Sequence, residues 1–467
     1  MIGAVAGGAL QPISRTLPVV LGDPRRIAAM ISYCTGLLLP AERKSVEPIA
    51  AVTAPTRTAA QHQALLHFVG QGDWSDEAVL GCVRAYTIRH IETHGAISAW
   101  IIDDTSFPKK GTHSVGVARQ YCGQLGKQEN CQVAVSLSIA NDHASLPVAY
   151  QLYLPQSWAS DAARRKKAGV PEDVEFKTKP QIALEQITWA CEAGLPRGVV
   201  IIDAGYGVET NFRNELSALK LKYVAGVKTT TTVWVPDTLS PEKSRRGRGP
   251  TSNGNDSAPL SVEKLALALP KSSWRTIRWR QGTNEVLSSR FARVRVRPAH
   301  HRNEAMETPE QWLLIEWPPN EEAPTKFWLS TLRTNITFSH LVTTAKLRWR
   351  IERDYLELKQ EIGLGHFEGR GWRGFHHHAT LCIAAYGFLL AERAVFPPRK
   401  RLSPGSSKNL PFPTITGRGA LPIRTERHVP DSIATLRREI AVRLATELDR
   451  CPCCTKRRST QKHRIYV

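Results

Sequence analysis

Aspartates stand directly after two apolar runs of the sequence. Asp103 and Asp104 follow the run 100–102, and Asp203 follows the run 199–202. Such runs predict buried strands, and if the two strands are neighbours, their aspartates converge at one end of the sheet. A buried carboxylate pair is costly through mutual repulsion unless a cation lies between the groups. Mg²⁺ suits that position, because it takes hard oxygen ligands and keeps few carboxylates besides water and phosphate.

A helical segment at 346–361 supplies a third acid. One of its faces carries residues spaced by four, three and four positions: Arg348, Glu352, Tyr355 and Lys359. Taken singly, each acid has a simpler interpretation. An aspartate after a strand is commonly a turn residue or a helix cap, and an Arg-Glu-Lys stripe is commonly a solvated, ion-paired face. The combination of the three acids, and not any one of them, favours a Mg²⁺ site beside phosphate-binding cations over these simpler interpretations.

The elements between residues 98 and 228 predict an α/β fold with an RNase H-like core. Apolar alternation and turn signals indicate three strands, a helix, a strand, a helix and a strand, in that order: 99–105, 131–140, 146–155, 180–194, 199–202, 212–219 and 222–227. Further strands are expected in the segments TIRWRQ, SSRFARVRVRP, QWLLIEW and TKFWLSTL. Helical periodicity then predicts one helix at 342–363 and a second, largely buried helix at 376–395.

This pattern divides the chain into five predicted parts: a helical, DNA-binding N-terminal domain (1–97), the first part of the core (98–228), a β-rich insertion (229–335), core helices with the third acid (336–395), and a basic, largely flexible C-terminal tail (396–467) with one helix near 432–448. A Pro-, Ser-, Gly- and Arg-rich stretch at 235–260 reads as a linker or surface loop.

The net charge and the cysteine content of the chain indicate which binding partners and which cellular compartment to expect. The chain has 63 Lys plus Arg against 42 Asp plus Glu, a formal charge of +21, which favours phosphate-rich partners through counterion release; a basic surface that only aids solubility is the alternative. Nine cysteines, mostly single within apolar runs, indicate a reducing compartment. Without a signal peptide or an apolar stretch of eighteen residues, we expect a soluble, cytoplasmic protein and no membrane partner.

Three blocks, 101–136, 199–207 and 348–381, resemble the DDE transposases of bacterial insertion sequences, most closely the insertion sequence 701 family within the insertion sequence 4 superfamily. By this resemblance Asp103 is the first acid, because Thr105 follows two positions on, with Asp104 as the alternative. Asp203 and Glu352 are the second and third acids, and Glu357 and Glu361 are not.

The resemblance implies cut-and-paste transposition. Asp103, Asp203 and Glu352 would bind two Mg²⁺ ions, with Mn²⁺ substituting. A homodimer on DNA would cleave the terminal inverted repeats and transfer the 3′-hydroxyl into target DNA in the bacterial nucleoid. The alternatives are an RNase H-like nuclease without strand transfer and a catalytically silent DNA-binding protein. Ala345 replaces a family tyrosine associated with hairpin DNA ends, so the sequence gives no support for a hairpin intermediate.

Other residues are candidates for supporting roles. Five cations are expected to position DNA phosphates: Lys109, Lys110, Arg348, Arg353 and Lys359. Trp372 and Phe375 could stack on an unpaired base, although packing is the commoner role of such aromatics. His376, His377 and His378 fit packing or DNA contact better than metal binding. Cys451, Cys453, Cys454 and His463 could hold zinc, but a reduced tail is favoured.

Overall fold

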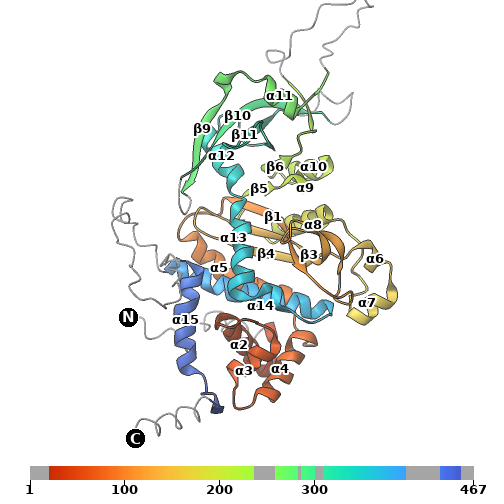
Figure 1. The fold of residues 1–467 in the computed structure, drawn as a ribbon, viewed down its shortest axis with the longest axis vertical. Coiled ribbons are helices and arrows are strands. Elements are labelled where there is room, and N and C mark those ends of the chain that lie inside the picture. The colour runs from red at the N-terminus through yellow and green to blue at the C-terminus, as the bar shows by residue number, and fades with distance from the viewer. Residues whose placement is uncertain (1–19, 236–257, 282–285, 300–308, 396–431, 454–467) are drawn as a thin grey trace, which may run out of the picture.

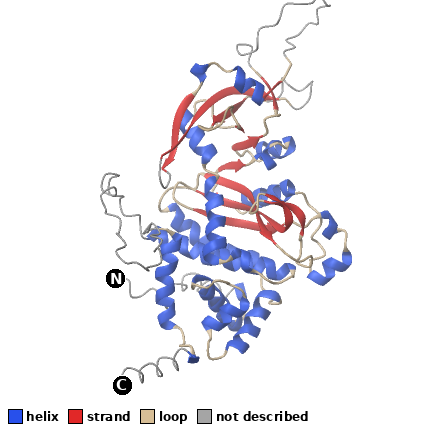
Figure 2. Cartoon of the chain, in the orientation of Figure 1, coloured by secondary structure: helices blue, strands red, loops and turns tan. Residues whose placement is uncertain are grey.

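The computed structural model describes residues 20–235, 258–281, 286–299, 309–395 and 432–453. The chain is elongated: the core sheet occupies the middle, the strands of the insertion lie at one end, and α2–α4 lie at the other (Figure 1). Figure 2 shows the same division by element type, with strands confined to the middle and the insertion end and helices dominating the other end.

The core sheet has β1 at its centre. β3 pairs antiparallel with β1 and β4 antiparallel with β3, whereas β5 and β6 continue the sheet on the other side of β1 in parallel. The order β4-β3-β1-β5-β6 confirms the α/β, RNase H-like fold predicted from the sequence. β2, which pairs with the first part of β3, was not predicted. The strands are β1 (Ala99–Pro108), β2 (Ala118–Cys122), β3 (Lys127–Ala140), β4 (Ser145–Leu152), β5 (Val199–Ile202) and β6 (Tyr223–Val227).

Helices connect these strands where the sequence predicts them. α8 (Lys179–Glu192) begins with a capping box between Thr178 and Gln181 and has Pro180 in its first turn. Its buried side chains pack under the sheet, and Gln186 Nε2 donates to the Val135 carbonyl at 3.0 Å. The short α9 (Ala204–Gly207) and α10 (Thr210–Ala218) link β5 to β6. β5 runs parallel to both β1 and β6, and its pairing with Ala99–Ile101 of β1 places the end of β5 beside the middle of β1.

The insertion extends the core sheet. β12 pairs antiparallel with β6, and the order then runs β12-β11-β10. Its two faces are covered by different helices, α11 (Val262–Ala268) and α12 (Phe338–Lys346). The four strands expected here are present, and β7 and β8 are additional: β7 (Thr232–Trp234), β8 (Leu260–Ser261), β9 (Arg275–Gln281), β10 (Val286–Pro298), β11 (Gln311–Trp317) and β12 (Lys326–Ser330).

The prediction of one continuous helix at 342–363 is wrong. The segment forms α12, then α13 (Trp349–Glu357), then a π-helical turn, η3 (Leu358–Ile362). The amides of Arg350 and Ile351 donate to carbonyls only three residues back, at 3.0 and 3.2 Å, so the chain turns between α12 and α13. η3 ends at Gly363, whose φ of 87° favours glycine. Arg348 therefore lies at the start of α13 instead of inside a longer helix.

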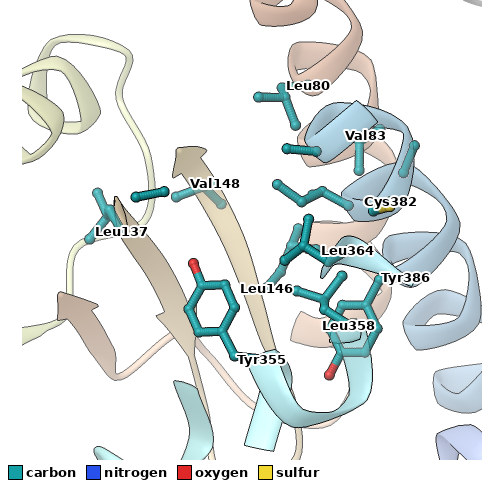
Figure 3. Packing of buried hydrophobic residues seen from close by; sticks show 14 of the residues in the cluster. Leu80, Val83, Leu137, Leu146, Val148, Tyr355, Leu358, Leu364, Cys382 and Tyr386 are labelled. Atoms are coloured by element: carbon teal, nitrogen blue, oxygen red, sulfur yellow. The ribbon is translucent and has the colours of Figure 1, made fainter. Parts of the chain in front are cut away.

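α14 (Trp372–Val395) begins four residues before the predicted start and is buried along most of its length. It packs against the N-terminal helices and against β4. Figure 3 shows side chains of α13, η3 and the 3₁₀ turn η4 (Leu364–His366) filling the space between core strands and helices: Tyr355, Leu358 and Leu364. The N-terminal helices are α2 (Pro24–Leu38), α3 (Val46–Thr53), α4 (Thr58–Gly70) and α5 (Asp76–Glu92).

The helix expected near 432–448 is present as α15 (Ile433–Glu447), capped by Ser432. It packs on α14 and α2, and Arg437 binds Glu361 of η3 at 2.8 Å. Within the described part of the chain, no helix is both long and apolar enough to span a membrane.

Candidate active site

Asp103 lies in the middle of β1, opposite Ser136 of β3. Its Oδ2 accepts a hydrogen bond of 2.8 Å from Arg348 Nη2, and its Oδ1 accepts one of 2.9 Å from the Asp104 amide. Burial raises the pKa of Asp103 to about 6, although the Arg348 guanidinium acts in the opposite direction and the Asp203 carboxylate adds to the rise. The fold thus holds a carboxylate where ionisation is costly, which is the expected condition of a site built for a further cation.

Asp203 follows β5 and serves as the N-cap of α9. Its Oδ1 accepts hydrogen bonds from the amides of Gly205 and Tyr206 at 2.8 and 3.3 Å. Its Oδ2 lies 3.7 Å from Arg348 Nη2. The helix-cap interpretation of this aspartate is therefore correct, and the remaining oxygen still faces the site.

Glycine is required where α9 meets β6. A Cβ atom on Gly207 would lie 2.0 Å from the Gly226 carbonyl oxygen, and one on Gly226 would lie 2.9 Å from the Ala204 nitrogen. Only glycine at these positions lets α9 pack this closely, and that packing holds Asp203 beside β1.

Glu352 completes a set of three acids around one guanidinium. Its Oε1 lies 2.9 Å from Arg348 Nη1, within the first turns of α13, and its side chain is 58% exposed. Arg348 therefore contacts Asp103, Asp203 and Glu352, which come from a strand, a strand end and a helix. The other two glutamates of this segment bind elsewhere: Glu357 is buried against Tyr386 and Arg353, and Glu361 binds Arg437.

Asp104 points away from this set. Its Oδ2 pairs with Lys179 Nζ of α8 at 2.5 Å, and its Oδ1 accepts a hydrogen bond from the Tyr206 hydroxyl. Neighbouring residues of a strand face opposite sides of the sheet, so only one aspartate of the pair can face Arg348. The geometry places Asp103 with the acids and Asp104 in a separate ion pair.

The side of α13 and η3 that carries Arg348 lies along β1. Tyr355 donates a hydrogen bond to the Ser136 hydroxyl, opposite Asp103, and Lys359 Nζ donates to the Ser106 carbonyl at 2.8 Å. Burial lowers the pKa of Lys359 to about 8. The face expected from the residue spacing thus contacts the sheet at three points, which fixes the height of Glu352 above β1.

A pocket of about 370 Å³ opens beside the acids, between the core and the insertion. Its lining includes Asp203, Arg348 and Glu352, together with three tryptophans from separate elements: Trp279 of β9, Trp328 of β12 and Trp349 of α13. Lys346 lies 4.5 Å from the Trp279 ring and binds the buried Glu316 at 2.9 Å. Ala345 also lines this pocket.

Sequence reasoning missed Lys179, Tyr206 and the tryptophan lining of the pocket. The only signal was the alternation of Arg and Trp in 275–280, which indicates a strand without indicating its partner. Contacts between β9, β12 and α13 depend on how the insertion folds back over the core. Spacing along the chain carries no information about that approach.

The remaining candidate cations are dispersed. Arg353 pairs with Glu357 at 2.6 Å, and Lys109 Nζ donates to the Phe367 carbonyl at 2.9 Å, so neither reaches the three acids in the structure. Lys110 is exposed on the loop after β1. The ring of Trp372 is partly buried and lies 4.4 Å from that of His376.

The aromatic and histidine residues at the start of α14 pack inside the protein. Phe375 is a core residue. His376 binds the Leu152 amide, His377 the carbonyls of Val69 and Trp74, and His378 the Tyr33 hydroxyl. The packing interpretation of the three histidines is therefore correct. Of the suggested zinc ligands, Cys454 and His463 lie outside the described residues.

Comparison with known proteins identifies the family. The model of the DDE superfamily endonucleases matches residues 20–286, more than half of the chain, so the protein belongs to this family. The match includes Asp103 and Asp203 and ends before Glu352. The chain is also similar to the "Probable transposase for insertion sequence element IS701" of Microchaete diplosiphon, with 29% identity over 207 residues, 44% of this chain. It spans half the length of that relative, and the resemblance predicted from the sequence is confirmed.

Proposed function

We propose that this protein is a DNA transposase that cleaves the ends of an insertion sequence and joins the released 3′-hydroxyl to target DNA. The observation that carries the proposal is the gathering of Asp103, Asp203 and Glu352 around the single positive charge of Arg348. Three acids from separate elements of an RNase H-like core would form a cation site if Arg348 moved from between them, and phosphoryl transfer on DNA is the chemistry that such a site serves.

The donor chemistry of the site fits Mg²⁺. All three side chains offer hard carboxylate oxygens, the ligands that Mg²⁺ prefers, and Mn²⁺ would substitute. In the described ranges no three His, Cys, Asp or Glu side chains are placed to hold one metal ion; at this site the Arg348 guanidinium lies between the acids. A pair of bound ions would supply activation of the attacking water or 3′-hydroxyl and stabilisation of the leaving oxygen.

The residues around the acids have separable tasks in this proposal. Asp103 and Asp203 are fixed by the sheet and by the cap of α9, whereas Glu352 is exposed on α13 and can adjust to the substrate. Arg348 balances the acids in the free protein and would turn to a DNA phosphate when metal ions bind. Lys359, anchored on β1, would hold a neighbouring phosphate. Such contacts contribute affinity and register without reading sequence.

The test uses an oligonucleotide duplex that carries the terminal repeat read from the DNA flanking the gene. The full chain, incubated with Mg²⁺ and a labelled end, should release a 3′-hydroxyl and join it to a second duplex, whereas Asp203→Asn should do neither. Release without joining would indicate a nuclease without strand transfer. Binding without release, under conditions that keep the protein folded, would indicate a silent DNA-binding protein.

A further inference from the structure

A basic surface lies beyond the end of β1, outside the candidate active site. Helix α7 (Ala162–Ala168) has four consecutive basic residues, followed directly by the buried Ala168. Two neighbouring loops, 109–117 and 367–371, add further cations. We call the following residues the α7 basic surface: Lys110, Arg164, Lys166, Lys167 and Arg370.

Backbone contacts hold these three segments together. Arg164 Nη2 donates to the Thr112 carbonyl at 3.1 Å, and the Val115 amide donates to the Arg370 carbonyl at 3.0 Å. A Cβ atom on Gly371 would lie 3.5 Å from the Ala168 carbonyl oxygen, so the last turn of α7 touches the second loop. The cations therefore belong to one surface, although they are up to 260 residues apart in the sequence.

Most of these cations are available to a partner. Lys110, Lys166, Lys167 and Arg370 are exposed, and none has a side-chain hydrogen bond or ion pair among the described residues. Arg164 is held over the Trp158 ring at 3.8 Å, which orients its guanidinium.

Nearby acids do not neutralise the surface. Asp161 caps α7 through the Arg164 amide, and Glu368 pairs with Arg43 at 2.7 Å. Glu172 and Asp173 are exposed after α7. The five cations thus outnumber the exposed acids that follow α7 and have no ion pair among the described residues: Glu172, Asp173 and Glu175. Unpaired Lys and Arg of this kind bind phosphate and release counterions from DNA.

The position of the surface follows from β1. Pro108, the last residue of β1, lies five positions after Asp103. A strand advances roughly 3.3 Å per residue, so this end lies about 17 Å from Asp103. B-form DNA advances about 3.4 Å per base pair. A duplex that followed β1 would therefore pass the end of this strand about five base pairs from the phosphate at the acids, and Lys110 lies two residues beyond that end. Lys359, bound to the Ser106 carbonyl, lies between the two points.

We propose that the α7 basic surface binds the backbone of the duplex being cleaved, about five or more base pairs from the scissile phosphate and without reading its sequence. This inference rests on the proposed function, because it takes the three acids as the point of cleavage. Lysine and arginine contacts to phosphate fix register and add affinity but do not discriminate bases. The α7 basic surface would hold one arm of the duplex, while the three acids act on the scissile phosphate.

The experiment compares two triple variants of the full chain. The first is Lys110→Ala with Lys166→Ala and Lys167→Ala. The control, of identical chemistry, changes three exposed lysines elsewhere: Lys222→Ala, Lys264→Ala and Lys271→Ala. Each protein is titrated with duplexes whose arms on either side of the cleavage point are three or twelve base pairs long, at several salt concentrations, and cleavage is then started with Mg²⁺.

The wild type and the control should bind more tightly when one of the two arms is long. The first variant should lose that preference, and its slope of log affinity against log salt should fall by up to about 2.7, at about 0.9 per lost phosphate contact. An unchanged slope and arm preference in the first variant would overturn the proposal. So would unchanged binding and cleavage of the substrate with a loss confined to target joining, since the surface would then hold target DNA.

These outcomes distinguish a failure of the proposed function from a failure of the inference about the α7 basic surface. If the wild type binds long arms more tightly in the salt titration yet cleaves no duplex, the proposed function fails. If the wild type cleaves and the two triple variants behave alike, only the inference about the α7 basic surface fails.

Discussion

Replacing Asp103 by asparagine should make the protein more stable while abolishing cleavage. The pKa of this carboxyl rises from 3.8 to about 6 because burial disfavours its charged form. A folded-state pKa above the unfolded value means that the native protein loses stability as pH rises through this interval. At about 1.36 kcal/mol per pH unit, the charged form costs roughly 3 kcal/mol at neutral pH. An amide of the same shape removes that cost.

The expected gain depends on pH in a defined way. With unfolded and folded values of 3.8 and about 6, the advantage of Asp103→Asn should be roughly 3 kcal/mol at pH 7.5 and about half of that at pH 5. Urea unfolding of both proteins at the two pH values, without divalent metal, measures it. Asp104→Asn is the matched control, because it breaks the ion pair with Lys179 and should cost roughly 1 kcal/mol. A lower unfolding free energy for Asp103→Asn at pH 7.5 would refute the reasoning, since the Arg348 contact would then outweigh burial.

Three further predictions concern activity and binding. Glu352→Gln should keep the fold and DNA binding but lose cleavage and joining by orders of magnitude, because the amide lacks the charge that holds a metal ion; Glu215→Gln on the exposed side of α10 should cleave normally, and the reverse pattern would show that the third acid is misassigned. Arg348→Ala should bind Mn²⁺ more tightly in calorimetry, since its guanidinium no longer competes for the three acids, while cleaving more slowly; weaker Mn²⁺ binding would contradict that role. Cleavage should require Mg²⁺ or Mn²⁺, whereas Ca²⁺ should allow binding with little cutting, and efficient cutting in a chelator would refute a metal-dependent site.

The sequence suggests Glu357→Gln as a control for Glu352→Gln, but the structure shows that this control is unsuitable. Glu357 lies off the face of Glu352, so spacing alone predicts that Glu357→Gln is harmless. The side chain is buried and accepts hydrogen bonds from Tyr386 at 2.9 Å and Arg353 at 2.6 Å. Substitution there would disturb the packing of α13 on α14 and would lower activity through the fold. Glu215 is the better comparison because it is exposed and contributes no recorded side-chain contact within the described residues.

The sequence by itself determined the elements of the core and the residue types available for catalysis. Strand and helix periods are local properties, so the strands around Asp103 and Asp203 and the helical character of 349–357 followed from neighbouring residues alone. The resemblance of the three blocks also identified the family. Burial of the two runs before the aspartates implied that their carboxylates would lie at or near the sheet.

Only the tertiary structure decided which groups meet. The strand pattern alone does not distinguish Asp103 from Asp104, and the resemblance favours Asp103 only through its spacing from Thr105. Which of the two side chains meets Arg348, 245 residues away along the chain, depends on the face of β1 that α13 contacts. The break before α13, the burial of Glu357 and the tryptophan pocket likewise arise from contacts between distant segments. Packing of α13 between the core sheet, α14 and the insertion sets these contacts, and no local propensity encodes them.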